Sequence, residues 1–357
     1  MLYLFLKILY NKIVAKLNYF EKRDLINNKK TGNYCEKLPE FCYDFFIGIE
    51  STTSSLTRMN YAMDLRVFFD FLSQIFNKKP TEFNLDDMKN VKASHIEQFL
   101  SYLSFYEFEG KVNKNHDKGK KRKLCSVRSL FKYLFNHDLI PSNVASKIAT
   151  PKEHLKEIIR LEKNEVGKLL NTVENAQGFS HRQKVYNKNT FERDNAIITL
   201  FLGTGIRISE LVGLNTDDFD FSQNAFKVTR KGGNQAILYF SDEVASSLKL
   251  WLRKRACLEI KDDEKAMFIS LQNKRICVRA VENLVGKFAK EAVPLKKISP
   301  HKLRSTYGTA LYRETKDIHI VADVLGHRDV NTTKKHYAAI SEDIRKSVAN
   351  KVTLKDE

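Results

Sequence analysis

Three short segments in the second half of the chain carry cations where they could bind an anion. The segment GTGIRISEL holds Arg207 three residues before Glu210. The segment HKLR holds His301 and Arg304, again three residues apart, and TRKGGN holds Lys231. A guanidinium group can donate two parallel hydrogen bonds to phosphate oxygens. These residue types could therefore form a site that binds an anion such as a phosphate.

A second histidine and a tyrosine follow in LGHRDVNTTKKHYAAI, where His327 precedes Tyr337 by ten residues. A phenol in this place could be a packed ring, a surface ring or a nucleophile. The cationic motifs also have plain structural interpretations. Arg207 and Glu210 could form a surface ion pair, HKLR could be a solvated helix start, and Lys231 could be an ordinary turn lysine. The residues next to each motif in the sequence do not decide between the structural and the functional interpretation.

Local signals predict the elements that would hold the two arginines. An apolar helix should break at residues 203–205, where two glycines allow a positive φ, and a new helix should then begin. Ser299 and Pro300 are typical of a helix start, so His301 and Arg304 should lie on one face of its first turn. The positive end of that helix could attract a phosphate.

The remaining motifs fall on a hairpin and around a helix end. Two runs rich in β-branched and aromatic residues flank KGGN within 225–240, which predicts a β-hairpin with Lys231 at its tip. Gly326 is placed to cap a helix that ends near residue 325. A short helix should then carry Tyr337.

The first half of the chain should be helical. Apolar residues recur at helical spacing over 55–76, 95–104 and 124–136. The polar stretch 110–123 separates the last two and is expected to be a loop. Its KGKKRK cluster should contact phosphates of a polyanion through five cations, namely Lys118, Lys120, Lys121, Arg122 and Lys123.

Length and composition suggest two domains and a polyanionic partner. The chain has 357 residues, 42% of them hydrophobic, and its 61 Lys and Arg against 43 Asp and Glu give a net charge of +18. The five cysteines form no CxxC pair, so we expect neither a structural zinc site nor a disulfide framework. The apolar start MLYLFLKILY is interrupted by Lys7 and is expected to be a helix, not a membrane span.

Taken in order, an arginine, a hairpin lysine, His-x-x-Arg, a second histidine and a tyrosine resemble the catalytic residues of the tyrosine site-specific recombinases, the family of λ-integrase, Cre and Xer. The resemblance covers roughly residues 45–345. It implies a mainly α fold with a small β-sheet, in a two-domain architecture that clamps DNA. We therefore expect an N-terminal extension of unclear role (1–44), a helical core-binding, SAM-like domain (45–148), a linker (149–160) and a catalytic domain with a C-terminal exchange helix (161–357).

The resemblance also implies roles for individual residues. The catalytic set would be Arg207, Lys231, His301, Arg304, His327 and Tyr337, with Glu210 in support and with no metal or other cofactor. Tyr337 would attack the scissile phosphorus, giving a 3′-phosphotyrosyl link and a free 5′-hydroxyl. Lys231 would protonate the leaving 5′-oxygen.

Partners and alternatives follow from the same resemblance. The expected partner is double-stranded DNA at specific recombination sites, bound by a homotetramer on two paired sites through exchange of the C-terminal helix. The expected location is cytoplasmic and nucleoid-associated, without membrane contact. Two alternatives are a catalytically silent DNA-binding protein of the same fold and an enzyme that resembles type IB topoisomerases.

Overall fold

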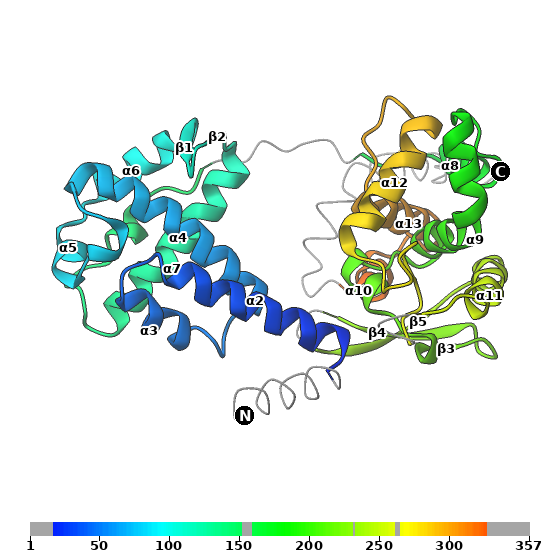
Figure 1. Cartoon of the computed structure of the whole chain (residues 1–357), viewed down its shortest axis with the longest axis horizontal. Helices are drawn as coiled ribbons and strands as arrows, with labels where there is room; N and C mark the ends of the chain where they lie inside the picture. The colour runs from blue at the N-terminus through cyan, green and yellow to red at the C-terminus, as the bar shows by residue number, and fades with distance from the viewer. Residues whose placement is uncertain (1–16, 152–158, 231–232, 261–264, 327–357) are drawn as a thin grey trace, which may run out of the picture. The chain divides into compact units, whose positions relative to one another are not determined.

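The computed structural model describes residues 17–151, 159–230, 233–260 and 265–326, which fall into two compact units divided after residue 156 (Figure 1). Both units are mainly helical and each contains a small antiparallel sheet, so the predicted fold class is confirmed. The apolar segment expected as an N-terminal helix lies outside the described residues. The functional roles given to the domains stay predictions.

The first unit is built around one long helix, α4. Its described elements are α2 (Tyr19–Cys35), α3 (Phe41–Gly48), α4 (Ser55–Phe76), α5 (Leu85–Asn90), α6 (Ala93–Tyr102), β1 (Tyr106–Phe108), β2 (Lys111–Asn113) and α7 (Asp117–Asn136). Helix α4 packs against α2, α6 and α7. Phe68 of α4 makes edge-to-face contacts with Phe99 and Phe131, and all three rings are fully buried. Helices predicted over 55–76 and 95–104 are thus confirmed, and α2 and α3 belong to this unit.

Helix α7 begins earlier than the sequence suggested. The loop expected over 110–123 is instead strand β2 followed by the first two turns of α7. Lysine and arginine are good helix formers, and Asp117 lies in the first turn, where an acidic side chain is favourable. The local polarity of this stretch therefore did not indicate a loop.

A buried carboxylate joins α4 to α7. Asp64 is fully buried and accepts hydrogen bonds from Arg122 (2.7 Å), Lys123 (3.2 Å) and Ser126 (2.9 Å). Lys123 is only 5% exposed, so its ammonium serves this cluster. The expectation that Lys123 contacts DNA is therefore wrong, because a buried ammonium needs its carboxylate partner.

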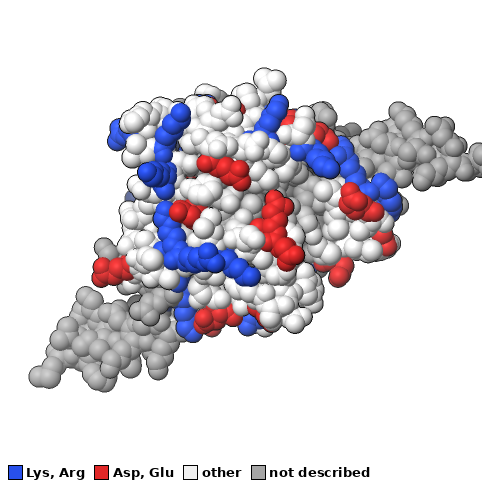
Figure 2. Space-filling model, turned by 90° about the vertical axis from the view of Figure 1, so that its right-hand side faces the viewer, with Lys and Arg blue, Asp and Glu red and all other residues white. Residues whose placement is uncertain are grey.

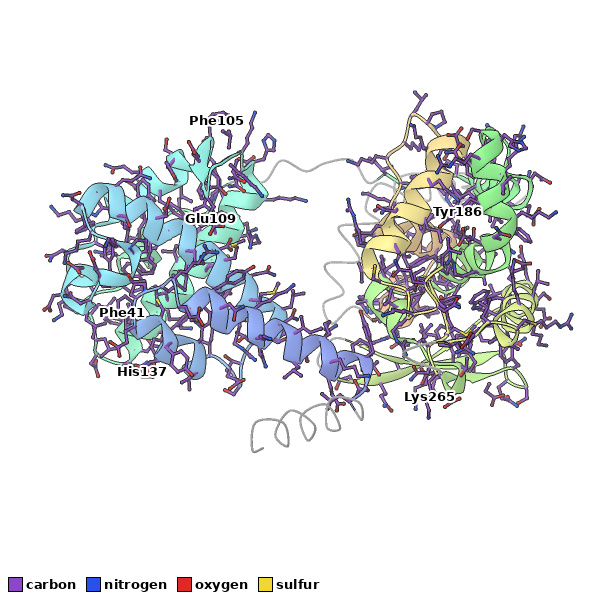
Figure 3. The ribbon with its side chains drawn as sticks, viewed as in Figure 1. Phe41, Phe105, Glu109, His137, Tyr186 and Lys265 are labelled. Carbon is purple, nitrogen blue, oxygen red and sulfur yellow. The ribbon has the colours of Figure 1, made fainter. Side chains whose placement is uncertain are left out.

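The β1–β2 hairpin is tied to α4 by another ion pair. Glu109, labelled in Figure 3, lies in the hairpin turn with a φ of 52° and accepts a hydrogen bond from Arg66. The side chain of Arg66 is buried, and its hydrogen bond lowers the pKa of the Glu109 carboxyl.

The second unit surrounds helix α9. Its described elements are α8 (Lys163–Asn175), α9 (His181–Thr204), α10 (Ile208–Gly213), β3 (Phe219–Asp220), β4 (Ala225–Thr229), β5 (Gln235–Tyr239), α11 (Asp242–Ala256), α12 (Val278–Ala292), α13 (Pro300–Thr315) and α14 (Ile318–Leu325). Helix α9 packs against α8, α11 and α13. The predicted hairpin is confirmed, with β4 and β5 paired from Ala225–Tyr239 to Thr229–Gln235.

The structure also bears on the cysteines and on the possibility of a membrane span. All five cysteines are free thiols, so no disulfide links them. None of the helices among the described residues combines the length and apolarity that a membrane span requires.

We expect Asp64→Asn to lower the free energy of unfolding of the first unit by about 3–5 kcal/mol, because it leaves the buried Lys123 ammonium without a carboxylate. Urea titration followed by far-UV circular dichroism measures the change. Asp86→Asn is the control, since Asp86 pairs with Lys89 on the surface and its loss should cost less than about 1 kcal/mol. Equal shifts in the two variants would contradict a structural role for the buried pair.

Candidate active site

Arg207 is positioned by a sharp break between two helices. Helix α9 ends at Thr204, and Gly205 follows with a φ of 62°, its N–H bonded to the Phe201 carbonyl at 3.0 Å. A Cβ atom at Gly205 would lie 2.5 Å from a ring carbon of Tyr307. Glycine is therefore required both by the backbone angle and by the approach of α13. The break was predicted from the sequence, and it leaves Arg207 as the residue before α10.

Glu210 orients the Arg207 guanidinium. The Glu210 carboxylate accepts the Arg207 backbone N–H at 2.9 Å and its Nη1 at 2.7 Å. Glu210 is 4% exposed, whereas the Arg207 side chain is 32% exposed. A surface ion pair, the plain alternative, would expose both partners. The buried carboxylate instead holds a partly exposed guanidinium in one direction.

Arg304 lies on the first turns of α13, which begins at Pro300 as predicted, with Ser299 as its N-cap. Arg304 is 5% exposed, and its Nη1 donates to the Gly205 carbonyl at 2.5 Å. The sequence suggested a cation beside the N–H groups of a helix start. The structure places this cation in the interior of the unit, while His301 on the same helix is exposed.

Three guanidinium groups converge on the last carbonyls of α14. Helix α14 ends at Leu325, and Gly326 caps it with a φ of 62°, which confirms the predicted cap. The donors come from the α9–α10 break, the β4–β5 hairpin and α13. The pairs are Arg207 Nη2 with Gly326 O (2.9 Å), Arg230 Nη2 with Val324 O (3.1 Å) and Arg304 Nη2 with Leu325 O.

The polarity of a helix end explains this convergence. The last carbonyls of a helix have no partner within the helix and carry the negative end of its dipole. Three positive groups that would otherwise repel one another can share this end. The same arrangement brings the predicted residues Arg207 and Arg304 to neighbouring acceptors, 119 and 21 residues away from them along the chain.

Three predicted residues cannot be placed, because Lys231, His327 and Tyr337 lie outside the described residues. Two of them directly follow described residues of the cluster, since Lys231 follows Arg230 and His327 follows Gly326. Sequence reasoning did not select Arg230. Its position beside Lys231 in TRKGGN was the only available signal.

Neither the surface charge in Figure 2 nor a group of candidate metal ligands identifies a further functional site among the described residues. On the face drawn in Figure 2, Lys and Arg side chains are interspersed with Asp and Glu over the described residues. The charge on that face therefore does not by itself mark a nucleic-acid surface. Among the described residues no group of His, Cys, Asp and Glu is arranged to hold a metal ion.

Comparison with known proteins decides the family. Residues 159–343 match the model of the phage integrase family, and this segment contains every element of the arginine cluster. The chain belongs to the phage integrase family. It is a tyrosine site-specific recombinase, which confirms the resemblance found in the sequence. Neither alternative, a silent DNA-binding protein or a topoisomerase-like enzyme, is supported.

Relatives are similar over most of the chain. A tyrosine recombinase XerC from Caldanaerobacter subterraneus subsp. tengcongensis is 32% identical over 346 residues, covering 94% of this chain and 92% of that relative. A tyrosine recombinase XerC from Syntrophus aciditrophicus is 29% identical over 304 residues, covering 84% and 92%. The solved XerH site-specific recombinase, in a post-cleavage complex with a palindromic difH substrate, shares the fold with a TM-score of 0.64 at 19% identity, covering 84% of this chain and 80% of that chain.

We expect Gly205→Ala to lower the free energy of unfolding by about 1–3 kcal/mol, because a methyl group there meets the Tyr307 ring and a left-handed φ. The fluorescence of Trp251, the chain's single tryptophan and buried in the same unit, reports the transition. Gly286→Ala is the control, because it adds a methyl group within α12 where no atom lies within 4 Å, and it should stabilise by about 0.5–1 kcal/mol. A destabilisation as large in the control would show that the Gly205 turn is not special.

Proposed function

We propose that the protein recombines double-stranded DNA at specific sites by two transesterification steps. Tyr337 attacks the scissile phosphorus, the bond to the 5′-oxygen breaks, and a 3′-phosphotyrosyl link and a free 5′-hydroxyl result. A 5′-hydroxyl from the partner strand reverses the step and releases the tyrosine. The link conserves the energy of the phosphodiester, so rejoining needs no ATP. The convergence of Arg207 and Arg304 at one helix end carries this proposal.

The two arginines would bind the phosphate and stabilise the charge that grows on it. A phosphodiester anion repels nucleophiles, so fixed positive charges around its oxygens lower the barrier to attack. Glu210 and the carbonyls of Gly205, Leu325 and Gly326 orient the guanidiniums before any substrate arrives. A preorganised pair needs less rearrangement in the transition state than two mobile side chains would.

The other predicted residues would move protons. Lys231 would donate its proton to the leaving 5′-oxygen as a general acid. His301, one turn before Arg304 on α13, would accept the tyrosine proton or orient a phosphate oxygen. His327 would donate a hydrogen bond to the phosphate. Each role needs a single proton transfer or hydrogen bond, and none needs a metal.

DNA is the proposed partner, in line with the net charge of +18 and with the difH substrate bound by XerH in the similar structure. On the first unit, the proposed phosphate contacts come from Lys118, Lys120, Lys121 and Arg122 at the start of α7. The homotetramer on two paired sites, joined through the C-terminal helix, stays a prediction, because residues 341–357 lie outside the described part of the chain. The expected nucleoid association is likewise a prediction.

The proposed nucleophile can be tested with Tyr337→Phe, which removes one oxygen and should leave folding and DNA binding nearly intact. A nicked suicide substrate loses the short strand that carries the 5′-hydroxyl, so cleavage becomes irreversible and the covalent adduct accumulates. The parent protein should form the adduct on a denaturing gel, and the variant should form none. An adduct from the phenylalanine variant would show that another residue attacks the phosphorus.

Replacing Lys118, Lys120 and Lys121 with glutamine should flatten the dependence of log K for DNA on log salt concentration. Each lost phosphate contact lowers the slope by about 0.9, so the slope should fall by up to about 3. A control variant with glutamine at the exposed Lys79, Lys89 and Lys92 removes the same charge from another part of the unit. An equal change of slope in both variants would show that overall charge, not the α7 start, sets the salt dependence.

A further inference from the structure

We propose that Arg230 is a positioning residue, which fixes the β4–β5 hairpin on the end of α14 and thereby places Lys231 beside the phosphate site. The inference rests on the proposed function of Lys231 as the general acid. It assigns a role to a residue that the ordered set of catalytic motifs does not include.

The backbone of Arg230 belongs to the hairpin tip. Strand β4 ends at Thr229, and the Arg230 N–H donates to the Asn234 carbonyl at 2.7 Å. The Arg230 carbonyl accepts the N–H of Gly233 at 3.1 Å, and Gly233 has a φ of 81°. These bonds close the tip, so the direction of Arg230 is coupled to the conformation of the turn.

The side chain of Arg230 leaves the hairpin and reaches α14. Its Nη2 donates to the Val324 carbonyl at 3.1 Å, across 94 residues of sequence. A Cβ atom built on Gly326 would lie 2.0 Å from Nη1 and 2.4 Å from Cζ of Arg230. The guanidinium therefore lies directly against the Gly326 backbone, and a side chain at residue 326 would displace it from this position.

The contact is costly, which argues for a function. The Nε atom of Arg230 is buried and has no hydrogen-bond partner in the described part of the chain. A buried donor without a partner loses its hydrogen bonds to water without replacement and so destabilises the folded state. An arginine on a hairpin tip could avoid that cost by turning into solvent. It instead joins Arg207 and Arg304, two positive groups, at the same helix end.

Lys231 directly follows Arg230 in the sequence. Under the proposal, fixing Arg230 on α14 keeps the next residue within reach of the phosphate site, because consecutive Cα atoms are about 3.8 Å apart. A general acid must come within about 2.6–3.2 Å of the oxygen that it protonates. An untethered tip would place the ammonium in that range less often, and a misplacement of about 1 Å can cost about a hundredfold in rate.

A substrate with sulfur in place of the leaving 5′-oxygen tests this role. A thiol has a pKa near 8.5, against about 15.7 for water, so a thiolate leaves without a general acid. We expect Arg230→Ala to slow single-turnover cleavage of the oxygen substrate at least about tenfold and to cleave the sulfur substrate at nearly the parent rate. Lys231→Ala should show the same rescue by sulfur.

Two control variants separate this role from others. Arg207→Lys should be slow on both substrates, because the phosphate clamp is needed whatever the leaving atom. Arg253→Ala removes an exposed arginine of α11 and should cleave both substrates at the parent rate. The melting curve of Trp251 fluorescence shows whether each variant is folded at the assay temperature.

The outcomes are distinct. Slowing of folded Arg230→Ala by the same factor on both substrates would overturn the inference, because it would make Arg230 a phosphate ligand or a support of the whole site. An unchanged rate on the oxygen substrate would also overturn it. If Lys231→Ala is not rescued by sulfur, the general-acid role itself fails, and the inference about Arg230 fails with it.

Discussion

The negative end of α14 is the acceptor on which the arginine cluster depends. Residues 324–326 present three carbonyls, and Arg207, Arg230 and Arg304 each donate to one of them. Three guanidiniums at this spacing repel one another unless negative or dipolar groups lie between them. The helix end supplies dipolar groups, and Glu210 adds one carboxylate beside Arg207, so the three guanidiniums keep a net positive charge that suits a phosphate.

Two glycines make the close approach possible, and each gives its carbonyl to one of the two predicted arginines. Gly205 ends α9 and gives its carbonyl to Arg304, while Gly326 ends α14 and gives its carbonyl to Arg207. Both have a φ of 62°. Gly326 directly precedes His327 in the sequence, so the backbone that binds Arg207 ends where the segment with the proposed nucleophile begins.

Several local features were predictable from sequence, although the early start of α7 was missed, and the tertiary features were not predictable. The helix break at Gly205, the helix start at Pro300, the cap at Gly326 and the hairpin each depend on residues close together in the chain. The inward direction of Arg304 depends on acceptors far away in sequence, and so does the burial of Lys123 against Asp64. Sequence spacing shows which residues share a face, but not which face a distant carbonyl or carboxylate will meet.

Other arginines of the chain also donate to backbone carbonyls, as the three arginines of the cluster do. Arg128 donates to the carbonyls of Ala145 and Ile148, and Arg275 donates to those of Val212 and Leu214. A planar guanidinium can bind several carbonyls at fixed angles and loses less hydration than an ammonium when buried, so arginine suits such places. Arginines of this kind add to the net charge of +18 while they serve the fold. The charge that remains for a polyanion is therefore smaller than the net charge suggests. In the proposed function, the lysines at the start of α7 would set the salt dependence of DNA binding, and the arginines oriented by the fold would act on the scissile phosphate.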